Sequence, residues 1–192
     1  ELQEIIRAVR TNAKAIMDAS AGVHIHINGS QFDAKSIVRL VKIVNKNEDL
    51  IFHALGTSAS RKNRWCKGID QDFLKKIEKR SIKSLRDINT AWYGRHNSNP
   101  MHYDNSRYRA LNLHALFNHG TLEFRLFNNP QDKKTLHAGR IKAWIQFTLA
   151  LAAKALTGKA ASSKKKNFNP ATAKYDMRVL TIKLGLIGKE YK

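Results

Sequence analysis

The sequence predicts an α+β domain in which an antiparallel sheet is flanked by helices. Two segments, 21–29 and 121–127, alternate apolar and polar residues with the period of two of a β-strand. Longer segments space their apolar residues three and four apart, as helices do. Strands embedded among many helices are typical of the α+β class. The 192 residues suffice for one such domain with a sizeable core.

Helices are expected around each of the strands. Leu2, Ile5 and Val9 begin a helical pattern over residues 1–19, and Asp33 is a suitable N-cap for a helix that carries Ile37. The other expected helices cover residues 47–55, 70–80, 84–92 and 132–157, and a last one starts near residue 170. Residues 109–114 form a further strand, joined to 121–127 around residues 118–120. Residues 56–68 and 93–107 are long polar loops, which are often functional inside a compact domain.

His24 and His26 lie on one face of the first strand, with Val23, Ile25 and Ile27 on the other. The apolar face can pack on a core. Alternate residues of a strand are about 6.6 Å apart, which suits two imidazoles that bind one metal ion or flank one phosphate. The exposed face of a half-buried strand would show the same pattern, so both interpretations stay open.

Glu123 and Arg125 have the same spacing on the second alternating strand, opposite Leu122, Phe124 and Leu126. A carboxylate among bulky apolar neighbours is costly to bury unless it is paired or bound to metal. Mg²⁺ prefers oxygen ligands, and a guanidinium binds phosphate or carboxylate with two hydrogen bonds. The pair is therefore consistent with half of a metal–phosphate site, or with a mild exposed ion pair. We expect the two strands to share one sheet, with Glu123 on the histidine face.

Both long loops combine cations with aromatic rings. Arg61 and Arg64 lie close to Trp65, and Arg109 follows Tyr108. Aromatic rings between cations can hold a base or a nucleotide ring. A solvated basic loop with one anchoring aromatic residue would look the same.

The charge of the chain is lopsided, with 35 Lys and Arg against 15 Asp and Glu and a net charge of +20. Such a surplus favours nucleic acid, an anionic membrane or a polyphosphate as partner, or a merely solvated basic surface. The single cysteine, Cys66, excludes an intrachain disulfide and suits a reducing, cytoplasmic compartment. The longest apolar run, residues 144–156, is too short to cross a bilayer, so we expect no membrane partner.

The segments GVHIHI, RKNRWCKG, RYRALNLHAL and GTLEFRLF, in this order, resemble the amidoligase family, and GTLEFRLF is the most specific match. These enzymes are carboxylate–amine ligases with a glutamine-synthetase-like catalytic fold. The resemblance covers residues 1–157, which we interpret as the catalytic domain. Residues 158–192 then form an appended basic linker and C-terminal helix.

The resemblance implies a reaction in which ATP and Mg²⁺ activate a small-molecule or peptide carboxylate as an acyl phosphate, and an amine then forms the amide. By motif, Glu123 and His24 would bind the metal, and Glu123 and Arg125 would act in catalysis. His26, Arg61, Arg64 and Arg109 would bind substrate or phosphate.

One feature of such ligases has no match in this sequence, an early strand of the Gly-x-Glu-x-Glu kind. We therefore expect a catalytic fold that is incomplete at its N-terminus, and a chain that binds Mg²⁺ weakly by itself. Two other hypotheses remain. A His-hydrophobic-His nuclease would nick single-stranded DNA with Tyr93, Tyr103 or Tyr108 as nucleophile. A non-catalytic basic domain would bind nucleic acid through its surface.

Overall fold

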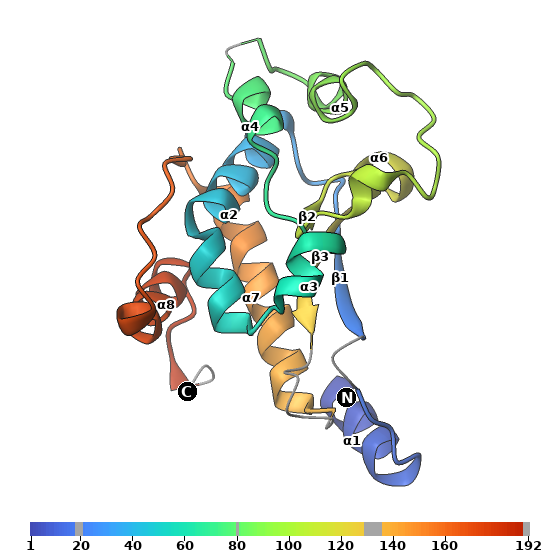
Figure 1. The fold of residues 1–192 in the computed structure, drawn as a ribbon, viewed down its shortest axis with the longest axis vertical. Coiled ribbons are helices and arrows are strands. Elements are labelled where there is room, and N and C mark those ends of the chain that lie inside the picture. Colours follow the sequence, from blue (N-terminus) through green and yellow to red (C-terminus); the bar gives the residue numbers. More distant parts are fainter. Residues whose placement is uncertain (18–20, 80, 129–135, 190–192) are drawn as a thin grey trace.

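The structure, a computed structural model, describes residues 1–17, 21–79, 81–128 and 136–189. It confirms the α+β class, because a small antiparallel sheet is surrounded by helices (Figure 1). The strands are β1 (Gly22–Asn28), β2 (Leu111–Asn112) and β3 (Thr121–Asn128), in the order β1-β3-β2. The α-helices are α1 (Leu2–Asn12), α2 (Ala34–Leu55), α3 (Ala59–Arg64), α4 (Gln71–Ile77), α5 (Leu85–Tyr93), α6 (His114–His119), α7 (Ala138–Thr157) and α8 (Ala173–Lys183). Two 3₁₀ turns, η1 (Asn105–Arg107) and η2 (Pro170–Thr172), complete the order.

The apolar face of β3 packs into the core of the domain. Leu122, Phe124 and Leu126 are buried, as the alternation predicted, and α2 and α7 run side by side next to the sheet (Figure 1). The pairing of β1 with β3 changes register between Val23 and Ile25. Beyond this irregularity, Phe127 also enters the core and stacks on Trp144 of α7 with ring centroids 5.3 Å apart.

Helix α2 is continuous, whereas the sequence predicted two helices with a break before residue 47. Asp33 caps it as expected, because its carboxylate accepts the backbone N–H of Ser36 at 2.7 Å. Two polar residues near the expected boundary, Asn45 and Asn47, lie inside the helix and are buried. Asn45 donates to the carbonyl of Ser163, so this polarity serves a contact with the C-terminal segment.

Short helices replace two segments that were expected to be a loop and a turn. Helix α3 lies inside the predicted loop 56–68, and its N-cap Ser58 accepts from the backbone N–H of Arg61. Helix α6 stands where a strand and turn were expected, so β2 is only two residues long. Gly120 ends α6 with a left-handed φ of 71°, a conformation that favours glycine.

The ends of two other helices differ from the prediction. Helix α1 stops at Asn12 instead of near residue 19, and Lys14 then takes a left-handed φ of 53°. Helix α7 begins at Ala138, and residues 132–135 of its predicted range lie outside the described residues. The short helices α4 and α5 lie where they were expected. No helix in the described ranges is long and apolar enough to cross a membrane.

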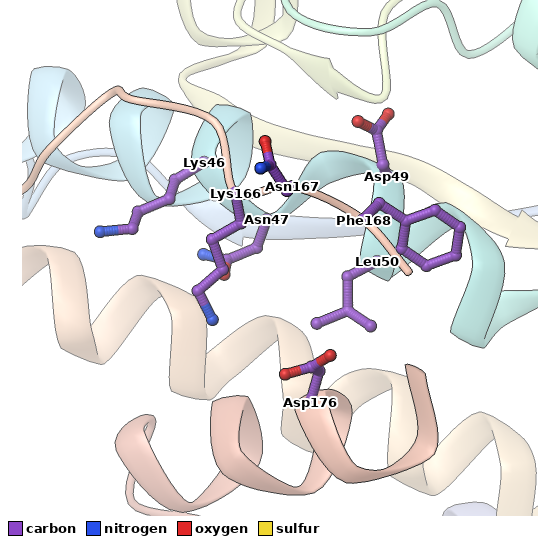
Figure 2. A pocket seen from close by; sticks show the side chains of 8 residues that line it. All are labelled: Lys46, Asn47, Asp49, Leu50, Lys166, Asn167, Phe168 and Asp176. Atoms are coloured by element: carbon purple, nitrogen blue, oxygen red, sulfur yellow. The ribbon is translucent and has the colours of Figure 1, made fainter. Parts of the chain in front are cut away.

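The C-terminal segment packs on the outer side of α2. Lys165 forms an ion pair with Glu48 at 3.0 Å, and the backbone N–H of Lys166 donates to the carbonyl of Lys46 at 3.0 Å. Figure 2 shows a small cavity of about 30 Å³ at this junction, which has room for one or two water molecules. Its lining comes from α2, from residues 166–168 and from Asp176 of α8. Leu180 of α8 joins the main core, so the segment is part of one packed unit.

Candidate active site

The two alternating strands are neighbours, as predicted, and their polar faces coincide. In the register of β1 and β3, His26 lies opposite Glu123. His24 Nδ1 is 2.9 Å from Glu123 Oε1, and His26 Nε2 is 3.6 Å from the same oxygen. His26 also contacts the hydroxyl of Thr121 through Nδ1 at 2.8 Å. The sheet therefore brings both histidines to one buried carboxylate.

Glu123 is the centre of this cluster, and only 5% of it is exposed. Arg125 Nη1 donates to its Oε1 at 2.8 Å, and the Asn112 side chain on β2 donates to its Oε2. Burial acts to raise the pKa of Glu123. The hydrogen bonds from His24 and Asn112 and the charge of Arg125 outweigh burial and lower this pKa to about 2. Glu123 is thus held as a carboxylate at any physiological pH.

Arg125 is as buried as its partner, with 6% exposed. Its Nε donates to the carbonyl of Trp65 at 3.2 Å, and its guanidinium lies 5.7 Å from the ring centroid of Tyr108. A buried charge pair is tolerated only when further hydrogen bonds satisfy both partners. The pair therefore links β3 to the loop that follows α3.

These side chains form part of the lining of a cavity of about 220 Å³. Residues from the two strands, from α6 and from the loop 93–107 contribute to it. The lining consists of His24, His26, His102, Arg107, Asn112, His114, Ala115, His119, Glu123 and Arg125. Five histidines and two arginines face a single carboxylate, so the cavity suits an anion such as a phosphate or a carboxylate.

His114 is the most deeply placed of the five histidines, with 2% exposed. Its Nδ1 is 2.6 Å from the hydroxyl of Tyr93. Burial lowers the pKa of His114, which favours the neutral imidazole at pH 7. Burial and the nearby Asp104 raise the pKa of Tyr93, so its hydroxyl stays protonated. A tyrosine nucleophile needs the opposite shift, and no tyrosine is among the described residues that line the cavity.

Sequence reasoning missed the contribution of α6, although it singled out the loop before β2. His114 and His119 were placed in a strand and beside a turn, and His102 and Arg107 lie in a loop without a regular pattern. The long loop 93–107 was a signal for function, but its path over the sheet could not be read from the sequence.

Three of the predicted anion-binding residues lie outside the cavity lining. Arg109 forms an ion pair with Asp70 at 2.6 Å and donates to the carbonyl of Gly68 at 3.0 Å. Arg64 is exposed and lies over the ring of Trp65, 4.5 Å from its centroid. The structure thus gives these two residues contacts that hold or cover the loops, and it does not bring them to Glu123.

Arg61 is the third of these residues, and it is buried behind the strands. Its guanidinium donates to the backbone carbonyl of Arg125 at 3.4 Å. It also occupies the space in which a Cβ of residue 22 would lie, which explains the glycine there. Its position supports the sheet from outside the cavity.

The metal-ligand prediction for Glu123 and His24 has limited geometric support. Glu123 is the only carboxylate among the described residues of the cavity lining. Its Oε1 already accepts a hydrogen bond from Arg125 and is the oxygen that His24 contacts. Within the described ranges, no group of three or more His, Cys, Asp or Glu side chains is arranged to hold a metal ion. The lining fits an anionic group better than it fits a free divalent cation.

Comparison with known proteins decides the family. A family model described as "Putative amidoligase enzyme" matches residues 1–152. The chain belongs to this amidoligase family. No curated protein and no solved structure matches the chain. Membership supports a ligase-type enzyme at the level of the family, and the match includes β1, β3 and every residue of the cavity lining.

Proposed function

We propose that the chain is an ATP- and Mg²⁺-dependent carboxylate–amine ligase of the amidoligase family. In this proposal a substrate carboxylate is phosphorylated by ATP, and an amine attacks the acyl phosphate, which forms an amide and releases phosphate. The observation that carries the proposal is the buried Glu123–Arg125 pair beside His24, on the wall of a cationic cavity. The three-stranded antiparallel sheet that carries this pair would belong to a glutamine-synthetase-like catalytic fold.

The cationic side chains of the cavity would bind and orient the anionic groups. Arg125 is fixed by Glu123 and by the carbonyl of Trp65, so its guanidinium needs little reorganisation to stabilise charge on a phosphoryl group. Arg107 reaches the same cavity from the loop before β2 and would hold a second anionic group. His26 would contact phosphate from the exposed side of the cavity.

Mg²⁺ would enter this site together with the nucleotide phosphates. It usually keeps several waters and takes one or two carboxylates along with substrate phosphates. Glu123 would be one oxygen ligand, with His24 beside it. Since a single carboxylate holds Mg²⁺ weakly, we expect weak binding of MgATP by this chain.

The substrates would be a small-molecule or peptide carboxylate and an amine. A cationic cavity of about 220 Å³ has room for the reacting groups and leaves the remainder of both substrates outside. A cytoplasmic enzyme would agree with a chain whose one cysteine, Cys66, is buried.

Calorimetric titration of the chain with ATP, with and without Mg²⁺, tests the proposal. Glu123→Gln keeps the shape of the side chain and removes its charge. We expect it to weaken MgATP binding about tenfold or more, the scale on which supporting groups of metal sites act. Binding of ATP without Mg²⁺ should not weaken, because the lost charge repels phosphate.

Glu48→Gln is the matched control. Glu48 is equally buried and is paired with Lys165, but it lies outside the histidine-lined cavity. Its variant should bind MgATP like the unmodified chain. Equal MgATP affinity in Glu123→Gln and Glu48→Gln would contradict the role of Glu123.

A further inference from the structure

A continuous series of aromatic and cationic side chains leads outward from the cavity. We call it the aromatic–cation ladder. It consists of Arg64, Trp65, Tyr108, Arg107, Tyr103 and His102. His102 and Arg107 also line the cavity, so the ladder begins at the candidate active site.

Each member of the ladder contacts the next one. The rings of Trp65 and Tyr108 meet edge to face with centroids 5.1 Å apart. The guanidinium of Arg107 lies 5.2 Å from the Tyr108 centroid and 5.0 Å from the Tyr103 centroid. His102 packs against Tyr103 at 4.5 Å. Arg107 thus joins the rings of Tyr108 and Tyr103, and Trp65 is added through its contact with Tyr108.

Backbone hydrogen bonds hold the two loops of the ladder together. The N–H of Lys67 donates to the carbonyl of Tyr108 at 3.0 Å, and the N–H of Ala110 donates to the carbonyl of Lys67 at 2.7 Å. The ion pair of Arg109 with Asp70 closes the same junction. The ladder is therefore built on a fixed platform.

The end of the ladder that carries Tyr103 is open to solvent. Tyr103 is 74% exposed, although a ring of this size normally buries most of its surface. Trp65 and Tyr108 are partly exposed. Exposed aromatic rings beside arginines can accept a planar ring by stacking.

The charge around the ladder is positive. Arg64 and Lys67 are exposed at one end, and Arg107 lies at its centre. The nearby carboxylates of Glu123 and Asp70 are paired with Arg125 and Arg109 respectively, and Asp104, beside Tyr103, accepts the backbone N–H of Ser106. An anionic ligand with several planar rings would match both properties of this surface.

We propose that the aromatic–cation ladder binds single-stranded nucleic acid. Trp65 and Tyr103 would each stack on a base, and Arg64 and Arg107 would contact the phosphates between them. Tyr108, whose ring lies under the guanidiniums of Arg107 and Arg125, would support the two outer rings. A duplex hides its base faces and could use only the charges. A mononucleotide could use only one of the rings. The net charge of +20 would increase the rate of encounter with such a polyanion.

Fluorescence anisotropy with a labelled twelve-residue oligothymidylate tests this proposal. Base stacking on one aromatic ring is worth a change in affinity of about fivefold to 150-fold. Tyr103→Ala should therefore weaken binding by about tenfold or more. Tyr175→Ala is the matched control, because Tyr175 is 70% exposed on α8, away from the ladder. Both side chains are exposed, so neither variant should lower the thermal midpoint.

Arg107→Ala and the choice of probe sharpen the test. The slope of log affinity against log salt should fall by about one in Arg107→Ala and stay unchanged in Tyr103→Ala. Three results would each overturn the proposal. They are equal affinities of Tyr103→Ala and Tyr175→Ala, equal affinity for a duplex of the same length, and equal affinity for thymidine monophosphate.

Discussion

Two buried carboxylates, Glu123 and Glu48, show how one chain uses the same group in two ways. They are 5% and 6% exposed, and each is paired with a cation. The partners of Glu48 are the backbone N–H of Ile69 at 2.6 Å and Lys165 of the C-terminal segment at 3.0 Å. Its function is therefore to fasten three segments together.

The partners of Glu123 are side chains that line the histidine-rich cavity. Arg125, His24 and Asn112 converge on its two oxygens, and they face the cavity together with it. A ligand in that cavity can exchange contacts with any of them. A buried carboxylate thus indicates chemistry when its partners converge on a common cavity, and indicates structure when its partners come from separate segments that it holds together, as Ile69 and Lys165 do.

The largest effect is expected from truncating the two carboxylates. Glu123→Ala should lower the free energy of unfolding by about 3–5 kcal/mol, because Arg125 is left as an uncompensated buried charge. Glu48→Ala should cost about 1–3 kcal/mol, the loss of a partner for the Ile69 N–H, because the half-exposed Lys165 returns to water. Urea unfolding of the two variants measures the difference. Equal losses would remove the contrast between the sites.

The second effect concerns acid stability. The folded-state pKa of Glu123, about 2, lies below its ordinary value of 4.5. This group therefore contributes stability that is fully present above pH 4.5 and is lost as the pH falls toward 2, by about 3 kcal/mol in all. Glu123→Gln has no such contribution, so its unfolding free energy should fall less between pH 5 and pH 3. Urea unfolding at several pH values measures this difference. If the unfolding free energies of the two proteins fall equally between pH 5 and pH 3, the cluster does not depress this pKa.

The third effect separates the charge of Arg125 from its shape. Arg125→Lys keeps the charge but loses the planar pair of donors. ATP-dependent phosphate release, in the presence of carboxylate and amine substrates, should fall by about one to three powers of ten. Arg109→Lys is the matched control, since Arg109 pairs with Asp70 outside the cavity. An unchanged rate in Arg125→Lys would assign the pair a structural role like that of Glu48.

The smallest effect is expected from removing Lys165, the partner of Glu48. Lys165→Ala should lower the free energy of unfolding by about 1 kcal/mol or less, since the lysine side chain is 42% exposed. MgATP binding should not change. Chemical denaturation and calorimetry test the two halves of this prediction, and a loss of MgATP affinity would connect the C-terminal segment to the active site.

The strands and their shared face could be predicted because alternation is a local property of the chain. The residue pattern alone is enough to place His24, His26, Glu123 and Arg125 on one side of one sheet. Strict alternation would place Phe127 on the face of Glu123 and Arg125, but the change of register between β1 and β3 lets it enter the core. Such a change of register depends on both strands, so the sequence of one strand alone does not predict it.

The rest of the site depends on contacts between segments that are distant in sequence. Arg109 meets Asp70 across 39 residues, and this junction determines where Arg107 and Tyr108 lie. The sequence predicted a separate helix over residues 47–55, whereas the structure has one helix in which Asn45 donates to the carbonyl of Ser163, 118 residues away. The predicted boundary near residue 157 and the roles of Arg61, Arg64 and Arg109 remain predictions.

The order of the strands also fixes when the site can form during synthesis. β1 pairs only with β3 among the described strands, and His26 meets Glu123 across a separation of almost a hundred residues. At about 5–20 residues per second, a ribosome takes roughly 5–20 s to supply that partner. Throughout this interval β1 lacks its partner strand, and β3 then pairs with β1 along one edge and with β2 along the other. The cavity can therefore form only after β3 has been synthesised, since no shorter nascent chain contains both its histidine wall and its carboxylate.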